Sequence, residues 1–278
     1  MSKRTMVEHK QHHDSNSKRA SSTEGELDTL FAQCDPVLID YGESAIVIEL
    51  HARDSVQAAS TLALQHVFWQ LEKMIKLQFT QASRSLQNHR LEDVVLGNQN
   101  LTLIFDPLRT DRQLLRQELL GVWDTLRQSA LSDPSDKASE YDGEPRRHLI
   151  EVLFNEETGP DLAALAAATN NSVETLIVQF CAADYRVLFT GFLPGFAYMS
   201  GLPAALVAER RSSPRREVPA GSIAIGGQQV GIYPQASPGG WQIIGRVADQ
   251  HLPIFDSQRS QASLFAAADY VRFTLHST

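Results

Sequence analysis

The sequence predicts an α+β protein, in which an N-terminal ferredoxin-like α/β sandwich precedes a C-terminal β-barrel. In residues 37–131, pairs of Val- and Ile-rich runs alternate with stretches of helical periodicity. Residues 185–275 consist almost entirely of short β-candidates separated by glycine and proline. Between the two halves lies a polar segment broken by proline and glycine, which is typical of a linker.

The N-terminal half is expected to contain two strand pairs and two helices. Residues 37–50 (VLIDYGESAIVIEL) read as a β-hairpin, and residues 55–77 carry apolar side chains at helical spacing. A second strand pair is predicted in residues 93–107, and residues 111–131 form a second amphipathic helix. The order ββαββα favours an antiparallel sheet with its helices on one face.

In the C-terminal half, HLIEVLF is predicted as a strand, and GPDLAALAAAT and NSVETLIVQFCAA as helices. The β-candidates that follow are YRVLFTGF, SIAIGG, QQVGIYP, WQIIGRV, LPIF and YVRFTLH. Many short strands at close spacing indicate a closed or nearly closed barrel.

These patterns divide the chain into four segments. Residues 1–35 contain almost nothing apolar before Leu27, so we expect a disordered polar tail. Residues 36–131 form the ferredoxin-like domain, residues 132–147 (SDPSDKASEYDGEPRR) the linker, and residues 148–278 the barrel domain.

Composition and motifs exclude several functional classes. A net charge of −8 over 278 residues argues against nucleic acid or an anionic membrane as the partner. No run of eighteen apolar residues occurs, and the N-terminus lacks an apolar leader, so we expect neither membrane insertion nor export. Cys34 and Cys181 are expected to be free thiols in the cytoplasm.

The usual catalytic signatures are also missing. The chain contains no G-x-S-x-G, H-E-x-x-H, C-x-x-C or G-x-x-x-x-G-K-[ST]. His148, His251 and His276 have no partner at a spacing that suggests zinc or a catalytic triad, so we expect them on the surface or at strand ends. The sequence therefore predicts no metal site. Residues 210–246, by contrast, interleave glycines and prolines with arginines and polar side chains, which would suit an anionic ligand. The alternative interpretation is structural, because barrels also need glycines at bends and prolines at strand ends.

Two long motifs carry a family resemblance. GFLPGFAYMSGLP (residues 191–203) and PRREVPAGSIAIGGQQVGIYPQASPGGWQIIGR (residues 214–246) resemble the family that contains the B subunit of 5-oxoprolinase, Kip-type inhibitors of a sporulation histidine kinase, and allophanate hydrolase subunit 1. The resemblance covers roughly residues 36–275. It implies a ferredoxin-like domain followed by a cyclophilin-like β-barrel.

The resemblance also implies a function. In the bacterial 5-oxoprolinase, such a chain pairs with a homologous second carboxyltransferase-type subunit and works with a third, lactam-hydrolase subunit. Together these subunits open 5-oxoproline to L-glutamate at the expense of ATP. This chain would be inactive alone, and without a Walker loop it would need another nucleotide-binding mode or its partner's surface. The alternatives are a regulatory inhibitor of a sensor histidine kinase and a subunit of an allophanate- or urea-type amide hydrolase.

The matched motifs supply candidate site residues. The catalytic candidates are Arg215, Ser222, Gln229 and Arg246. Arg215 and Arg246 would contact an anion, Ser222, Gln229 and Ser237 would form hydrogen bonds, and Tyr233 and Trp241 would stack on the ligand. The candidates for binding substrate or partner are Tyr185, Phe192, Pro194, Gly195, Phe196, Tyr198, Pro219, Gly221, Tyr233, Ser237, Gly239, Gly240 and Trp241.

Four departures from the family pattern bear on activity, one of which is in the strand before Gly159, where Val152-Leu153-Phe154-Asn155 lacks the family's Pro and Tyr. Phe180 occupies a position where members commonly carry histidine, and Val230 replaces the usual threonine. The usual Pro-Gly-Asp before the last strand reads Ala267-Ala268-Asp269. Loss of a histidine or a hydroxyl near the site would remove a proton-transfer group or a hydrogen bond. These departures therefore bear on the choice between an enzyme subunit and a regulatory protein.

Overall fold

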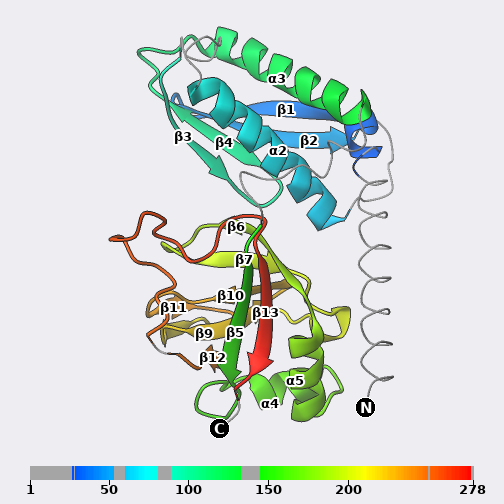
Figure 1. Ribbon diagram of the computed structural model, residues 1–278, viewed down its shortest axis with the longest axis vertical. Helices are drawn as coiled ribbons and strands as arrows, with labels where there is room; N and C mark the ends of the chain where they lie inside the picture. The colour runs from blue at the N-terminus through cyan, green and yellow to red at the C-terminus, as the bar shows by residue number, and fades with distance from the viewer. Residues whose placement is uncertain are drawn as a thin grey trace, which may run out of the picture. The chain divides into compact units, whose positions relative to one another are not determined.

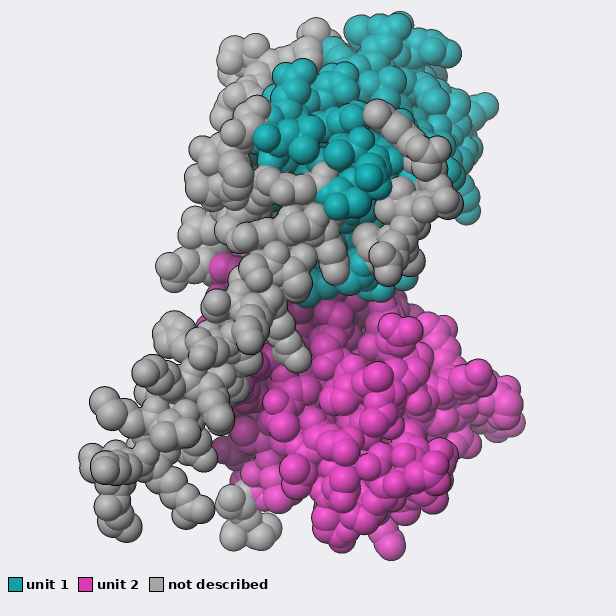
Figure 2. Space-filling view, turned by 90° about the vertical axis from the view of Figure 1, so that its right-hand side faces the viewer, with its two compact units in different colours: residues 1–142 teal, residues 143–278 magenta. Residues whose placement is uncertain are grey.

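The computed structural model describes residues 27, 29–52, 60–80, 89–132, 145–249 and 251–276. The chain divides into two compact units, residues 1–142 and 143–278, coloured separately in Figure 2. Most of the predicted tail and linker lies outside the described residues, so those boundaries stay predictions. Residues 29–33, within the range assigned to the tail, are helical, and Leu30 and Phe31 among them are buried.

The described part of the first unit has a four-stranded antiparallel sheet in the order β1-β2-β4-β3. Its elements are β1 (Cys34–Tyr41), β2 (Ala45–Ala52), α2 (Thr61–Thr80), β3 (Leu91–Leu96), β4 (Leu101–Phe105) and α3 (Arg112–Ser132). Figure 1 shows both helices on one face of the sheet. The apolar sides of these helices supply Trp69 and Trp123 to the core.

The predicted helices on one sheet face are confirmed, but the ferredoxin-like type is not. That type has the element order βαββαβ, whereas this unit runs ββαββα, so each strand pairs with its neighbour in a hairpin. The predicted start of the first helix at residue 55 lies outside the described residues.

The second unit is built on a closed seven-stranded barrel in the order β10-β7-β6-β13-β5-β12-β9. The barrel strands are β5 (Arg147–Leu153), β6 (Tyr185–Thr190), β7 (Ala197–Ser200), β9 (Ser222–Gly226), β10 (Gln229–Ile232), β12 (Gln242–Val247) and β13 (Tyr270–Leu275). β8 (Arg215–Val218) and β11 (Ser237–Gly239) form a separate two-stranded sheet. The predicted barrel is thus confirmed, and its closure fits a cyclophilin-like architecture.

Two helices lie at one end of this barrel (Figure 1), α4 (Leu162–Ala168) and α5 (Val173–Ala182). Ser172 caps α5, because its Oγ accepts a hydrogen bond of 3.1 Å from the Thr175 amide. The predicted strand LPIF is wrong: within it, only Phe255 forms an isolated bridge, to Ser263. No helix among the described residues has the length and apolar character needed to span a bilayer.

Alternation along the strands creates two apolar layers. Side chains from all seven barrel strands and from both helices form the interior core, which includes Ile223 and Ile225 of β9. The residue between them, Ala224, points to the opposite face and belongs to a second cluster. That outer cluster, which the β8–β11 region helps to cover, contains most of the aromatic residues singled out from the sequence.

Candidate functional site

Five aromatic side chains, here called the aromatic cluster, gather on the outer face of the barrel: Phe192, Phe196, Tyr198, Tyr233 and Trp241. Phe196 lies at its centre, with its ring centroid 4.9 Å from Tyr198, 5.3 Å from Tyr233 and 5.6 Å from Trp241. The rings meet edge to face, the arrangement that their quadrupoles favour. The structure thus brings together aromatic candidates that are up to 49 positions apart in the sequence.

Two glycines allow these rings to lie directly on the backbone. A Cβ atom at Gly231 would lie 2.6 Å from Phe196 Cζ, and one at Gly239 would collide with the Tyr233 hydroxyl. Both glycines are part of the second motif, so its glycine pattern has a packing cause. Phe189, which the sequence analysis missed, extends the cluster by stacking on Tyr198 at 4.4 Å.

The loop before β7 supports the cluster with a tight turn. Phe196 donates its amide to the Leu193 carbonyl at 3.0 Å, and Gly191 donates to the Phe196 carbonyl at 3.1 Å. Within this turn Phe192 has φ = 67°, a conformation that costs a non-glycine residue about 1 kcal/mol or more. Its ring nevertheless stays 61% exposed. Pro194 is exposed as well, whereas Gly195 is buried against Phe255.

A buried carboxylate, Asp161, anchors the segment that covers the cluster. Its side chain is 7% exposed and accepts hydrogen bonds from Arg215 Nη2 at 2.7 Å and Arg211 Nη1 at 2.9 Å. It also accepts one from the Ile243 amide at 2.7 Å. The Arg215 charge is therefore offset inside the protein, so this arginine is built to hold β8 in place. Asp161 and Arg211 were not among the sequence candidates.

The other three catalytic candidates do not converge with one another. Ser222 and Arg246 are cross-strand neighbours on β9 and β12, with Ser222 buried and Arg246 Nη2 3.7 Å from the exposed Glu157 carboxylate. Gln229 pairs with Gly226, at the opposite end of β9. At about 3.3 Å per residue, roughly 13 Å of strand separates Ser222 from Gln229.

The remaining binding candidates have mostly structural positions. Tyr185 is fully buried in the barrel core, where its hydroxyl donates to the Phe180 carbonyl at 3.0 Å. Gly221, with φ = 76°, donates its amide to the Tyr233 carbonyl at 2.8 Å. The other three shape the β8–β11 region: Pro219 accepts from the Ser222 amide, Gly240 accepts from the Arg211 amide, and Ser237 is buried opposite Val218.

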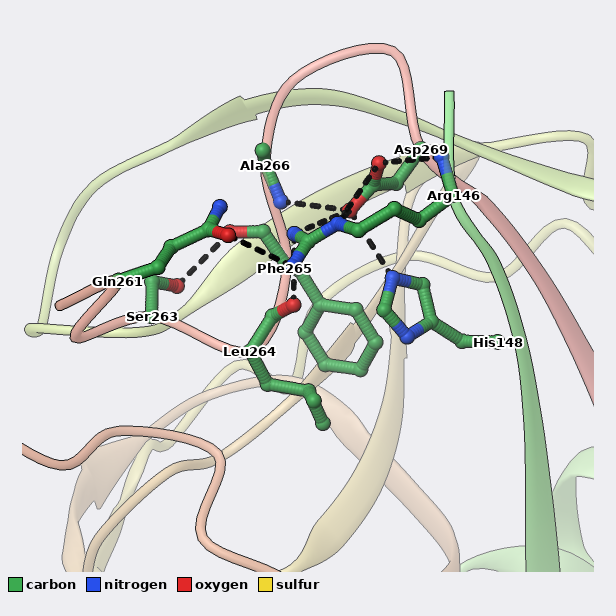
Figure 3. Close-up of polar contacts among 8 residues, drawn as sticks. All are labelled: Arg146, His148, Gln261, Ser263, Leu264, Phe265, Ala266 and Asp269. Carbon is green, nitrogen blue, oxygen red and sulfur yellow. Dashed lines mark hydrogen bonds and ion pairs between the residues drawn. The ribbon is translucent and has the colours of Figure 1, made fainter. Parts of the chain in front are cut away.

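A second polar cluster surrounds Asp269 at the start of β13, as Figure 3 shows. The carboxylate, 4% exposed, accepts hydrogen bonds from Arg146 Nη2 at 2.7 Å, His148 Nε2 at 2.9 Å and the Ala266 amide at 2.9 Å. Burial alone would raise the pKa of Asp269, but the bonds from His148, Arg146 and the Ala266 amide outweigh it, and the pKa lies below its ordinary value.

The Asp269 cluster joins the two parallel strands of the barrel. Arg146 also donates to the Gln261 side chain and to the Leu264 carbonyl, both at 2.8 Å, and the His148 ring packs edge-on against Phe265. The bonds from Arg146 and His148 thus run to groups of the protein itself, which indicates an anchor for the loop before β13. His148, expected on the surface or at a strand end, lies next to the start of β5 with its side chain largely buried. Its partner Asp269 lies 121 positions away in the sequence, so no local spacing reveals the pair.

Over the described residues, no group of three or more His, Cys, Asp and Glu side chains could hold a metal ion. Such a group is what a divalent cation requires.

Comparisons with known proteins agree with this architecture. A family model described as carboxyltransferase domain, subdomain C and D, matches residues 38–265. The B subunit of 5-oxoprolinase from Haemophilus influenzae is 35% identical over 238 residues, which cover 85% of this chain and 96% of that protein. The protein of the same name from Escherichia coli O157:H7 is 34% identical over 232 residues, or 84% of this chain and 92% of that protein.

Solved structures show the same fold within longer chains. The structure of TTHA0988 superposes with a TM-score of 0.62 and 26% identity, covering 84% of this chain and 40% of that chain. The urea carboxylase of Kluyveromyces lactis gives a TM-score of 0.63 at 16% identity, covering 87% of this chain and 22% of that chain. At so low an identity, the second likeness concerns the fold alone. The chain therefore spans less than half the length of either solved protein.

Proposed function

Because the chain belongs to the carboxyltransferase domain, subdomain C and D, family, we propose that it is a subunit of an ATP-dependent 5-oxoprolinase complex that opens 5-oxoproline to L-glutamate. The observation that carries this proposal is the likeness to the 5-oxoprolinase B subunits, which spans 85% of this chain and 96% of the Haemophilus influenzae protein. The match from residue 38 to residue 265 includes parts of both compact units. The similarity to the family therefore extends beyond the barrel to the first unit.

The aromatic cluster is the part of this chain that suits such a substrate. A lactam ring is small and flat, and aromatic faces and edges contact flat rings favourably. Phe192 is 61% exposed and is held in a conformation that costs free energy, so its apolar side chain is available for contact with a ligand. We therefore place the substrate ring at this outer face of the barrel.

Two departures from the family pattern leave this surface intact. Phe180 is fully buried, with its ring 5.0 Å from Phe273 and 5.2 Å from Tyr185. Val230 is fully buried in the same core. Neither residue belongs to the aromatic cluster, so their replacement of histidine and threonine alters the core and not the proposed binding face.

We assign the nucleotide to the partner subunits. ATP would supply a phosphoryl group to the lactam oxygen, which makes the stable amide easier to hydrolyse. Two observations support this assignment: the sequence has no Walker loop, and the described residues contain no group of acidic, histidine and cysteine side chains that suits a divalent cation. This chain's part is then to bind and orient the substrate.

The proposed complex contains two further chains, a homologous carboxyltransferase-type subunit and a lactam-hydrolase subunit. The relatives are named as one lettered subunit of 5-oxoprolinase, which supports an assembly of several subunits. TTHA0988, of which this fold covers 40%, supports it too, because that chain joins such a unit to further sequence. Free Cys34 and Cys181 are compatible with the cytoplasm, where we place the complex.

The test is ATP-dependent release of glutamate from 5-oxoproline by the chain reconstituted with its two partner subunits. We expect turnover that disappears when this chain or ATP is omitted. The partners are first shown to be competent with the Haemophilus influenzae relative in place of this chain. Competent partners that give no turnover with this chain would contradict the proposal and favour the regulatory alternative.

A further inference from the structure

One arginine beside the aromatic cluster keeps its charge available. Arg211 and Arg215 share the buried Asp161, and Arg246 lies near Glu157. Arg210 is exposed and makes no ion pair with any described residue. Its guanidinium carbon lies 5.7 Å from the centre of the Trp241 ring, a cation–π contact that orients the group without neutralising it.

A hydroxyl group beside the same indole is also available. The Tyr198 ring lies 5.7 Å from the Trp241 ring and is held by the Phe189 stack. Its hydroxyl forms no hydrogen bond within the described part of the chain, unlike the Tyr233 hydroxyl, which the Trp241 backbone bonds. Burial raises the pKa of Tyr198 while the Arg210 charge lowers it, so the two groups are near enough to interact and the phenol remains a donor.

We infer that Arg210 and Tyr198 form a carboxylate-binding pair at the edge of the aromatic cluster. An arginine fork binds a carboxylate bidentately, and a phenol O–H can donate a further hydrogen bond. The adjoining rings would contact a flat ring that bears the carboxylate. The site would therefore take a small ring acid, and the identification of that acid as 5-oxoproline rests on the proposed function.

This pair replaces the sequence-based assignment of the anion contact. Arg215 was expected to bind the anion, but its Nη2 is engaged by Asp161 at 2.7 Å. A second carboxylate there would have to share a guanidinium that already has a buried counterion. Arg210 needs no such exchange, since its guanidinium group lies beside the indole and has no counterion among the described residues.

The experiment compares 5-oxoproline with 2-pyrrolidinone, the same lactam without its carboxylate, in the reconstituted complex. For Arg210→Gln and Tyr198→Phe we expect the KM for 5-oxoproline to rise, by roughly 10- to 100-fold for Arg210→Gln, with kcat little changed. Inhibition by 2-pyrrolidinone should stay the same, because it has no group for the pair to bind. The matched control is Arg216→Gln, which removes an exposed charge from β8.

Each outcome decides the inference. An unchanged KM for 5-oxoproline, or equal weakening of both lactams, would overturn it while leaving the 5-oxoprolinase function intact. If the wild-type complex gives no turnover, the proposed function fails, and calorimetric titration of the wild-type chain with 5-oxoprolinate decides instead. Binding that is lost in Arg210→Gln and kept in Arg216→Gln would support the pair, and no binding to the wild type would overturn it.

Discussion

At the scale of single residues, two buried aspartates hold the second unit together by different means. Asp161 accepts bonds from two arginines and one amide near the aromatic cluster. Asp269 accepts bonds from an arginine, a histidine and amides at the start of β13. In both cases a carboxylate has been removed from water, so its stability depends on every donor that replaces the lost hydration.

Replacement of Asp161 by asparagine should destabilise the second unit by about 2 to 3 kcal/mol. The change leaves Arg211 and Arg215 without their counterion while the amide still fills the space. Urea unfolding monitored by circular dichroism measures the free energy. The matched control is Glu157→Gln, whose side chain is 86% exposed and lies 3.7 Å from Arg246; it should change stability by less than about 0.5 kcal/mol. Equal effects of the two substitutions would contradict the anchoring role.

Asp269 should make stability depend on acid pH. Its pKa in the folded chain lies below the ordinary value of 3.8, so folding favours the ionised form. The resulting stabilisation is complete above that ordinary value and is lost as pH falls through the folded-state pKa. Asp269→Asn should lower stability at pH 7 by about 2 to 3 kcal/mol and flatten the acid limb of a urea-unfolding series between about pH 5 and 2. An acid limb as steep as that of the wild type would show that other carboxylates cause it.

The residue scale also shows where sequence reasoning stops. The glycine and aromatic positions of the cluster could be predicted, since they fall in two continuous motifs that end at Arg246. The pairs Asp161–Arg215 and His148–Asp269 could not, because 54 and 121 positions separate their members. Only the closed barrel brings such residues together. The structure, and not the sequence, identifies Asp161 as the counterion of Arg215.

At the scale of elements, the positions of glycine and proline correctly predicted where most of the barrel strands begin and end. The prediction failed for the shortest pieces: β7 of the barrel, with four residues, and β8 and β11 beside it, with four and three residues, were not predicted. LPIF was predicted as a strand because its residues are apolar, but it forms a loop with one isolated bridge, at Phe255. A strand of three or four residues carries too few alternations to differ from a buried loop.

Gly231 of β10 provides a test of how closely strand and ring must approach. Gly231→Ala would place a methyl group 2.6 Å from Phe196 Cζ and 3.2 Å from the Ala197 carbonyl oxygen. The ring must then move, and we expect a loss of about 1 to 3 kcal/mol in the free energy of unfolding. Near-ultraviolet circular dichroism should report the altered aromatic packing. An unchanged spectrum with unchanged stability would contradict the close packing.

Replacing Gly121, in the middle of α3, by alanine should stabilise the protein, whereas the same change at Gly231 should destabilise it. A Cβ atom at this exposed glycine would meet nothing within 4 Å, so alanine costs no packing and restricts the unfolded chain. Gly121→Ala should raise the stability of the first unit by about 0.5 to 1 kcal/mol. The measurement is the urea midpoint, and the substitution serves as the matched control for Gly231→Ala. A fall in the midpoint would show that α3 makes a contact at this position.

At the scale of the whole molecule, the second unit should fold without the first. All seven strands of the closed barrel, and both helices that extend its core, come from residues 143–278. A closed barrel leaves no edge strand to be completed by another part of the chain. Produced alone, residues 143–278 should therefore unfold cooperatively in urea, with a midpoint close to that of the corresponding transition in the full chain.

Proteolysis tests the same independence in the intact protein. The polar, proline-containing sequence of residues 132–147 predicts cleavage there, and a fragment beginning near residue 143 should resist further digestion. Asp269→Asn and Asp161→Asn should each lower the stability of this fragment by the same amount as in the full chain, because their partners all lie within it. A fragment that binds hydrophobic dyes and unfolds without cooperativity would show that the barrel needs the first unit to complete its packing.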